Sequence, residues 1–154
     1  MLNAQEMEKV NEIVTRLFVA TDQRDWSKVI ELSAPEVEID YSSMNGQPAS
    51  VLSPSQITEG WKTLLPGFEH THHQLGNFIT TIDESRAHVF CYGTATHYLP
   101  DENGDIWTVV GSYDINLEKD QNDQWKITKV KFNFKYQSGN TSLPEKAMNR
   151  IKNS

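Results

Sequence analysis

Residues 86–119 read RAHVFCYGTATHYLPDENGDIWTVVGSYDINLEK, and this stretch decides the fold. Apolar and polar residues alternate along 86–99 and again along 106–119, which is typical of β-strands with one buried face. The polar link from Asp101 to Asp105 is short enough for an antiparallel hairpin. The same alternation occurs over 71–82 and 124–136, so we predict a meander of four long antiparallel strands.

The last of these strands changes phase near residues 128–129. Trp125 and Ile127 place apolar side chains at odd positions, whereas Val130 and Phe132 place them at even positions. One extra residue at this point would form a β-bulge, and bulges bend a sheet. We therefore predict that the sheet is curved.

The first half of the chain has helical periodicity. Residues 5–20 carry one apolar stripe, and Asp25 is a suitable N-cap for a second helix that Pro35 ends. Further predicted elements are a strand at 37–41, a loop at 43–53, a helix that starts at Ser53-Pro54 and a short helix at 144–151. This order predicts an α+β fold, with N-terminal helices packed on one face of a curved antiparallel sheet that encloses a cone-shaped pocket.

Length and composition narrow the class of protein. A chain of 154 residues predicts a single domain, 1–154, and 37% hydrophobic with 23% charged residues is an ordinary globular composition. The net charge of −7 disfavours nucleic acid as a partner. No apolar run approaches the roughly 18 residues of a membrane span, and residues 1–9 lack a signal-peptide core. We expect a cytoplasmic protein with no membrane partner, and a buried, inert thiol at Cys91, the only cysteine.

Several polar side chains interrupt segments that otherwise have the pattern of a core. Burying such groups is costly unless they are paired, so a small domain that carries several of them is predicted to have a pocket. Groups of this kind can also transfer protons. They are Asp22, Tyr41, His73, His97, Ser112 and Asp114.

Strand parity separates the histidines. Alternate residues of a strand face opposite sides, so His72 and His73 cannot share a face, and we expect His70 and His72 to be exposed rather than to bind metal. His73 shares its predicted inward face with Asn77, while His97 follows small residues on the next strand. Each histidine could be purely structural, but two on adjacent strands favour a site. A neutral imidazole can both accept and return a proton near pH 7.

Ser112 and Asp114 share one face of the strand at 106–119. This pattern fits either a pocket or a solvated sheet face. The sequence has no Gly-x-Ser-x-Gly nucleophile elbow and no glycine-rich phosphate loop. Both acyl-enzyme hydrolysis and nucleotide chemistry are therefore disfavoured.

An ordered set of short motifs resembles the nuclear-transport-factor-2-like superfamily, and within it the SnoaL-like group that includes the scytalone dehydratases. The resemblance runs from about residue 8 to residue 136. The motifs are Asp22-Gln-Arg-Asp25-Trp26, Ser33-Ala-Pro35, Ile39-Asp-Tyr41, Thr71-His-His73-Gln-Leu-Gly76, His97, Gly111-Ser112-Tyr-Asp114 and Trp125-Lys-Ile.

The resemblance implies elimination of water without a cofactor inside a cone-shaped pocket. It assigns acid–base roles to Asp22, His73 and His97, polarisation of a ketone through water to Tyr41, and a substrate contact to Ser112. Two positions depart from the family pattern. A second tyrosine is replaced by Thr21, and an asparagine is replaced by Asp114, which indicates a different substrate.

These observations lead to a cofactor-independent lyase (dehydratase) or isomerase that acts on a small hydrophobic, oxygen-bearing molecule. His73 is the predicted general base, Asp22 is expected to orient the imidazole of His97, and Tyr41 stabilises an enolate. Ser112, Asp114 and Asn77 are predicted to contact the substrate. The alternatives are a non-catalytic small-molecule-binding or assembly module and a polyketide-type cyclase. We expect no cofactor or metal, and a homo-oligomer.

Overall fold

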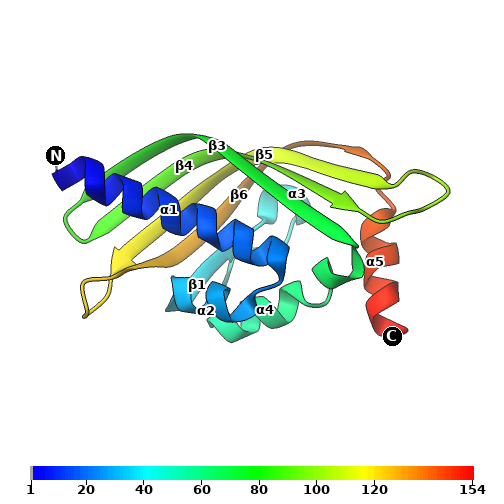
Figure 1. The fold of residues 1–154 in the computed structure, drawn as a ribbon, viewed down its shortest axis with the longest axis horizontal. Helices are drawn as coiled ribbons and strands as arrows, with labels where there is room; N and C mark the ends of the chain where they lie inside the picture. Colours follow the sequence, from blue (N-terminus) through cyan, green and yellow to red (C-terminus); the bar gives the residue numbers. More distant parts are fainter. Residues whose placement is uncertain (1) are drawn as a thin grey trace.

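The computed structural model describes residues 2–154. Its helices are α1 (Leu2–Gln23), α2 (Trp26–Leu32), α3 (Ser42–Asn45), α4 (Pro54–Trp61) and α5 (Leu143–Lys152), and a 3₁₀ helix, η1, spans Leu65–Gly67. The strands are β1 (Ser33–Asp40), β2 (Ser50–Leu52), β3 (His70–Asp83), β4 (Arg86–Tyr98), β5 (Ile106–Lys119) and β6 (Trp125–Gly139) (Figure 1).

The six strands form one sheet in the order β2-β1-β6-β5-β4-β3. The predicted meander is confirmed, because β3, β4, β5 and β6 pair antiparallel in sequence order. The sheet as a whole is mixed rather than antiparallel, since β1 runs parallel to β6. β1 enters from α2 and lies beside the last strand of the meander, so no hairpin constrains its direction.

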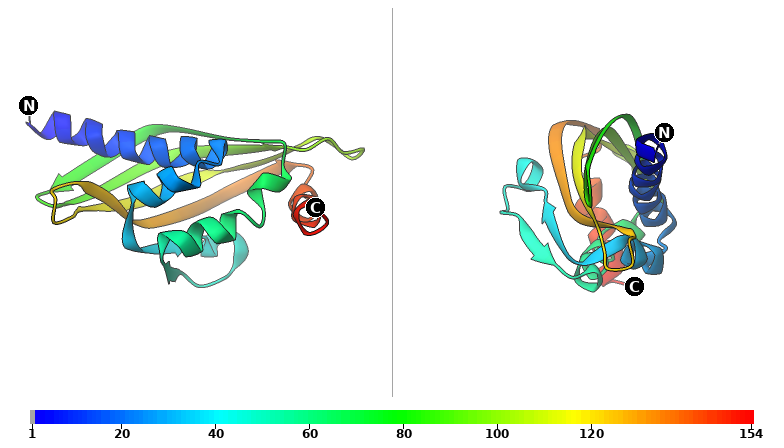
Figure 2. Two further views of the ribbon diagram at one scale, coloured as in Figure 1. Left: turned by 60° about the horizontal axis from the view of Figure 1, so that its bottom comes forward. Right: turned by 90° about the vertical axis from the view of Figure 1, so that its left-hand side faces the viewer.

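Three irregularities in the pairing of the meander strands β3 to β6 shape the sheet. Lys129 and Ile127 pair with the adjacent residues Asn116 and Leu117, so Thr128 is the extra residue of the predicted bulge. A second register shift lies at Lys135, and a third lies in β3 between Gly76 and Ile79. Bulges increase twist and bend a strand. The resulting curved sheet wraps around the helices in the right-hand view of Figure 2.

The helices cover the concave face of this sheet. α1 packs along β3 and buries Val10, Val14 and Leu17, which follow one another at helical spacing (Figures 1 and 2). It continues beyond the predicted end at residue 20, which brings Asp22 into its last turn. None of the helices within residues 2–154 combines the length and the apolar character that crossing a membrane requires.

Local signals place the shorter elements. Asp25 caps α2 by accepting a hydrogen bond from the backbone of Lys28, as predicted. Ser53 and Gln56 form a capping box at the start of α4. Two predictions need correction: α2 ends at Leu32, before Pro35, and the loop at 43–53 contains α3 and β2.

Candidate active site

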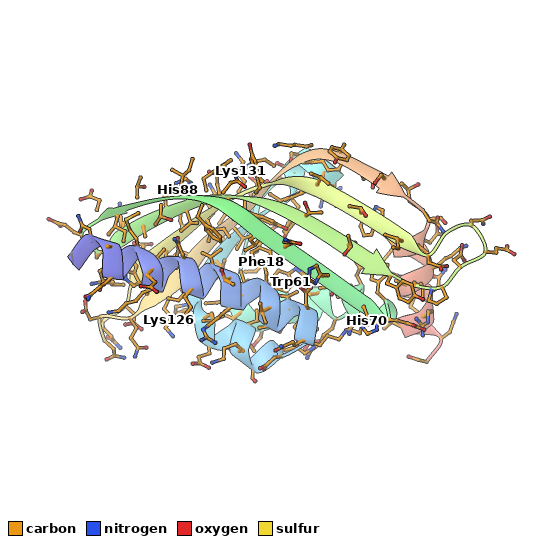
Figure 3. The ribbon with its side chains drawn as sticks, turned by 45° about the horizontal axis from the view of Figure 1, so that its top comes forward. Phe18, Trp61, His70, His88, Lys126 and Lys131 are labelled. Atoms are coloured by element: carbon orange, nitrogen blue, oxygen red, sulfur yellow. The ribbon has the colours of Figure 1, made fainter. Side chains whose placement is uncertain are left out.

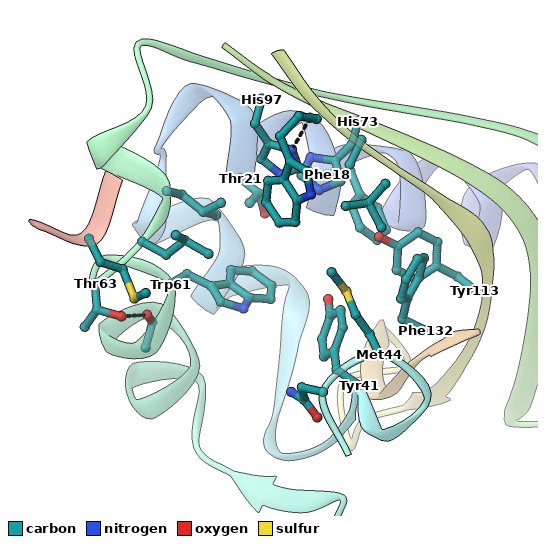
Figure 4. Close-up of a pocket in the computed structure, with 18 residues that line it drawn as sticks. Phe18, Thr21, Tyr41, Met44, Trp61, Thr63, His73, His97, Tyr113 and Phe132 are labelled. Carbon is teal, nitrogen blue, oxygen red and sulfur yellow. Dashed lines mark hydrogen bonds between the residues drawn. The ribbon is translucent and has the colours of Figure 1, made fainter. Parts of the chain in front are cut away.

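The concave face of the sheet and the helices enclose a cavity of about 380 Å³. Aromatic rings form a large part of its wall, and among residues 2–154 no lysine or arginine lines it. An apolar pocket with a few converging polar groups is the usual form of a small-molecule site. The aromatic lining residues are Phe18, Tyr41, Trp61, Trp107, Tyr113 and Phe132, together with His73 and His97 (Figure 4).

His73, which lines this wall, pairs with the carboxylate of Asp22, which is not itself a lining residue. His73 Nδ1 lies 2.7 Å from Asp22 Oδ1, and the His73 backbone N–H donates to Asp22 Oδ2 at 2.7 Å. The Thr71 hydroxyl donates to Asp22 Oδ1 at 2.9 Å. Only 16% of the Asp22 side chain and 12% of the His73 side chain is exposed. The end of α1 and the start of β3 therefore hold this pair rigidly.

The hydrogen bonds decide which nitrogen of His73 is available. Burial raises the pKa of Asp22, but the hydrogen bonds and charge of His73, helped by Thr71, outweigh burial and leave this pKa below its usual value. Asp22 is thus an ionised carboxylate, which can only accept, so His73 Nδ1 must carry a proton. In the neutral ring, Nε2 then has an unshared pair and can act as a base.

His97 is held in a different way. Its Nδ1 donates to the backbone carbonyl oxygen of Trp107 at 3.0 Å, and its ring packs against the rings of Phe68 and Trp107 at centroid distances of 4.9 and 4.2 Å. Burial lowers the pKa of His97 to about 4, in spite of this hydrogen bond. The ring is neutral at pH 7. Its Nε2 can accept a hydrogen bond but is a poor base.

The two histidines face the same cavity, as predicted from adjacent strands. Their ring centroids lie 6.3 Å apart, with the rings at 78° to each other. The prediction that Asp22 orients His97 was wrong, because Asp22 pairs with His73 and not with His97. The reason is topological: α1 crosses β3, which carries His73, and reaches the cavity at that strand.

Tyr41 lies at the end of β1 and lines the cavity, where burial raises its pKa to about 12. It is therefore a neutral phenol that can donate a hydrogen bond. The sequence reasoning missed a second phenol, Tyr113, which also lines the cavity and is 4% exposed. The odd-residue parity of β5, shared with Trp107 and Val109, was the signal that could have revealed it.

Ser112 and Asp114 do not line the cavity, because they occupy the even positions of β5 and face the opposite side of the sheet. Asp114 instead accepts from His88 Nε2 at 2.7 Å and from Asn133 Nδ2 at 2.8 Å, and Asn133 also donates to Ser112 at 3.2 Å. Figure 3 shows His88 on this outer face. Ser112 and Asp114 therefore lie outside the candidate site.

Asn77 also lies outside the cavity. It has a positive φ of 56° within the β3 irregularity, and its side chain is exposed. Past this point the parity of β3 reverses, which leaves Ile79 62% exposed. His70 and His72 are exposed, as predicted. Within residues 2–154, no group of three or more His, Cys, Asp or Glu side chains is arranged to hold a metal ion.

Comparison with known proteins places this architecture in a family. The sequence profile of the SnoaL-like domain matches residues 3–131. No match was found among curated protein sequences. Among solved structures, a protein from Kribbella flavida is 25% identical, with a TM-score of 0.82 and coverage of 94% of this chain and 98% of that chain.

Two further solved structures share the fold at lower identity. A candidate scytalone dehydratase from Novosphingobium aromaticivorans is 19% identical, with a TM-score of 0.72 over 90% of this chain and 89% of that chain. The hexachlorocyclohexane dehydrochlorinase LinA-type3 from Novosphingobium barchaimii is 11% identical, with a TM-score of 0.76 over 90% and 92%. The profile match and the curved mixed sheet lead to one conclusion: this chain belongs to the SnoaL-like domain family and has the nuclear-transport-factor-2-like fold.

Proposed function

We propose that this protein is a cofactor-independent lyase that uses His73 as a general base to eliminate water from a small, apolar, oxygen-bearing molecule. The observation that carries the proposal is the Asp22–His73 pair. The Asp22 carboxylate binds His73 Nδ1, and the His73 ring lines the cavity. General acid–base catalysis by such a positioned group contributes about 10²–10⁴-fold in rate.

The reaction would proceed through an enolate. His73 Nε2 removes the proton from the carbon next to a ketone, the C–H electron pair forms the C=C bond of the enolate, and the π pair of the carbonyl moves onto the ketone oxygen. The Tyr41 hydroxyl stabilises this oxygen, directly or through a water molecule. When the ketone re-forms, the bond between the β-carbon and its hydroxyl breaks, and the departing hydroxide takes the proton from His73. The products are water and an unsaturated ketone.

Each neighbouring group has a role in this scheme. Asp22 stabilises the imidazolium that forms when His73 takes the proton, because a carboxylate strengthens the hydrogen bond to a charged ring. His97, neutral at pH 7, accepts a hydrogen bond from a substrate hydroxyl. The absence of lysine and arginine from the cavity wall favours an uncharged substrate. The names of two similar structures, a scytalone dehydratase candidate and a dehydrochlorinase, also denote eliminations.

The test uses a bicyclic β-hydroxyketone, β-hydroxytetralone, because its dehydration and tautomerisation give a fluorescent naphthol. His73→Ala should lower turnover by about 10²-fold or more. The matched control is His88→Ala, since His88 forms an equally short 2.7 Å contact with Asp114 on the outer face. Turnover by His73→Ala at the wild-type rate would sink the assignment.

A second assay covers the isomerase and binding alternatives. Exchange of α-protons of cyclic ketones for deuterium, followed by NMR, reports proton abstraction even where no hydroxyl can leave. Exchange without elimination would indicate an isomerase. Binding of ketones without exchange or turnover at any pH would indicate a non-catalytic module.

A further inference from the structure

Close packing holds the Tyr113 ring in place at the cavity wall. Its ring lies across the backbone of β4 at Gly93, where an added Cβ would come within 2.4 Å of the ring carbon Cε2. Phe18 and Phe132 pack against the ring at centroid distances of 4.7 and 5.0 Å. Glycine at position 93 is therefore required for this placement, and the ring has little freedom to turn away.

The hydroxyl at the end of this ring has no hydrogen-bond partner among residues 2–154, yet the surrounding protein does not seal it. Within that range, Arg24 Nε is the one fully enclosed side-chain polar atom without a partner. The Tyr113 hydroxyl thus keeps accessible surface, and the residue lines the cavity (Figure 4). A ligand that fills the cavity would cover this hydroxyl, and a covered hydroxyl without a partner costs free energy, so the donor is suited to a ligand that offers an acceptor.

The aromatic rings of the cavity wall follow one another from His73 to Tyr41. Successive ring centroids lie 5.3 Å apart from His73 to Phe18, 4.7 Å from Phe18 to Tyr113, 5.0 Å from Tyr113 to Phe132 and 5.9 Å from Phe132 to Tyr41. The base is thus at one end of an aromatic wall, and the phenols follow along it. A flat ligand against this wall would present a C–H bond to His73 and an oxygen to the phenols.

Charge on that oxygen needs a neutral donor here. No lysine or arginine lines the cavity, so no cation on its wall can balance an enolate. Burial, with smaller effects from Tyr41, Cys91 and Asp22, raises the pKa of Tyr113 well above its ordinary value. The phenol keeps its proton at pH 7 and can donate it in a hydrogen bond, which is strongest to an ionised acceptor.

We propose, building on the function proposed above, that Tyr113 is a catalytic residue whose hydroxyl donates a hydrogen bond to the substrate oxygen as it becomes an enolate. The substrate class is a flat, uncharged cyclic ketone with a hydroxyl group on the β-carbon. His73 removes the α-proton, and the C–H electron pair forms the C=C bond of the enolate. Negative charge then develops on the oxygen that faces Tyr113. Tyr113 keeps its own proton throughout, so the leaving hydroxide is protonated by His73 alone.

The test is an equilibrium measurement that does not depend on turnover. Dinitrophenolate, an aromatic oxyanion, and dinitrobenzene, which lacks the oxygen, are titrated into the wild type and Tyr113→Phe. The pH is one at which the dinitrophenol probe is ionised. Hydrogen bonds to charged groups imply a loss of about tenfold or more in dinitrophenolate affinity, with dinitrobenzene affinity changed by less than about twofold. Tyr92→Phe is the matched control, because Tyr92 is 45% exposed.

The outcomes separate this inference from the function on which it builds. Equal dinitrophenolate affinity in Tyr113→Phe and the wild type, equal losses for both probes, or no wild-type preference for dinitrophenolate would each overturn the role of Tyr113. If wild-type turnover is absent but the oxyanion-specific loss remains, the lyase proposal fails while the donor role stands. With β-hydroxytetralone, we expect Tyr113→Phe to lower kcat about tenfold with little change in KM.

Discussion

Replacement of Asp22 by asparagine changes the charge of the candidate site while nearly keeping its shape. The Asp22 carboxylate accepts from the Thr71 hydroxyl, from the His73 backbone N–H and from His73 Nδ1. Asparagine has a single acceptor oxygen, so it cannot satisfy all of these donors and cannot balance an imidazolium. Hydrogen bonds to charged groups contribute about 1.5–3 kcal/mol. Asp22→Asn should therefore lower turnover of β-hydroxytetralone about 10- to 100-fold, since each 1.36 kcal/mol is tenfold in rate.

The same substitution should alter stability in a pH-dependent way. The pKa of Asp22 is lower in the folded protein than in the unfolded chain, so its contribution is present above the unfolded pKa of about 3.9 and is lost as pH falls through the folded pKa. Urea unfolding at pH 7 should show a loss of about 1–3 kcal/mol in Asp22→Asn. Below pH 4 the gap from the wild type should narrow.

The control for this experiment is Asp114→Asn. Asp114 also accepts a 2.7 Å hydrogen bond from a histidine, but it lies on the outer face of the sheet and its side chain is 34% exposed. Its replacement should leave turnover unchanged. The reasoning is refuted if Asp22→Asn turns over at the wild-type rate, or if Asp114→Asn loses as much activity.

Other predictions concern residues that line the cavity or stabilise the fold around it. Because burial lowers the pKa of His97 to about 4, the unfolded chain binds this proton at higher pH, so the wild type should lose about 3 kcal/mol more stability than His97→Gln between pH 7 and pH 4 in urea titrations. Gly93→Ala should cost about 1–3 kcal/mol through its clash with the Tyr113 ring, and adding Tyr113→Leu should recover part of that loss in a double-mutant cycle. Burial, with a smaller effect of Asp114, raises the pKa of Cys91 to about 12, so an aromatic disulfide reagent should label it only after unfolding. Ser53→Ala should lower thermal stability by about 1 kcal/mol through loss of the α4 cap.

Much of the fold was readable from local pattern. Alternation along 86–99 and 106–119 predicted β4 and β5 almost to the residue, and the phase change at 128–129 predicted the bulge opposite Asn116 and Leu117. These signals are local because side-chain parity and the link length of a hairpin depend on neighbours in sequence. The parallel pairing of β1 with β6 was not readable, since it joins segments about ninety residues apart without a hairpin.

The candidate site could likewise be predicted only in part from local pattern. Parity alone put His73 and His97 on inward faces of adjacent strands and exposed His70 and His72. Parity failed for Asn77, because the irregularity between Gly76 and Ile79 reverses the faces of β3, and alternation carried along the strand takes no account of an extra residue.

The sequence by itself determined which side chains were available for acid–base chemistry and which strands would carry them, because residue type and alternation are properties of the chain. Only the tertiary structure decided that Asp22 holds His73, that Tyr113 joins the cavity, and that Asp114 pairs with His88 on the outer face. The physical reason is that these contacts depend on where α1 crosses the sheet and on how the bulges bend it. Both are set by packing between segments far apart in the chain.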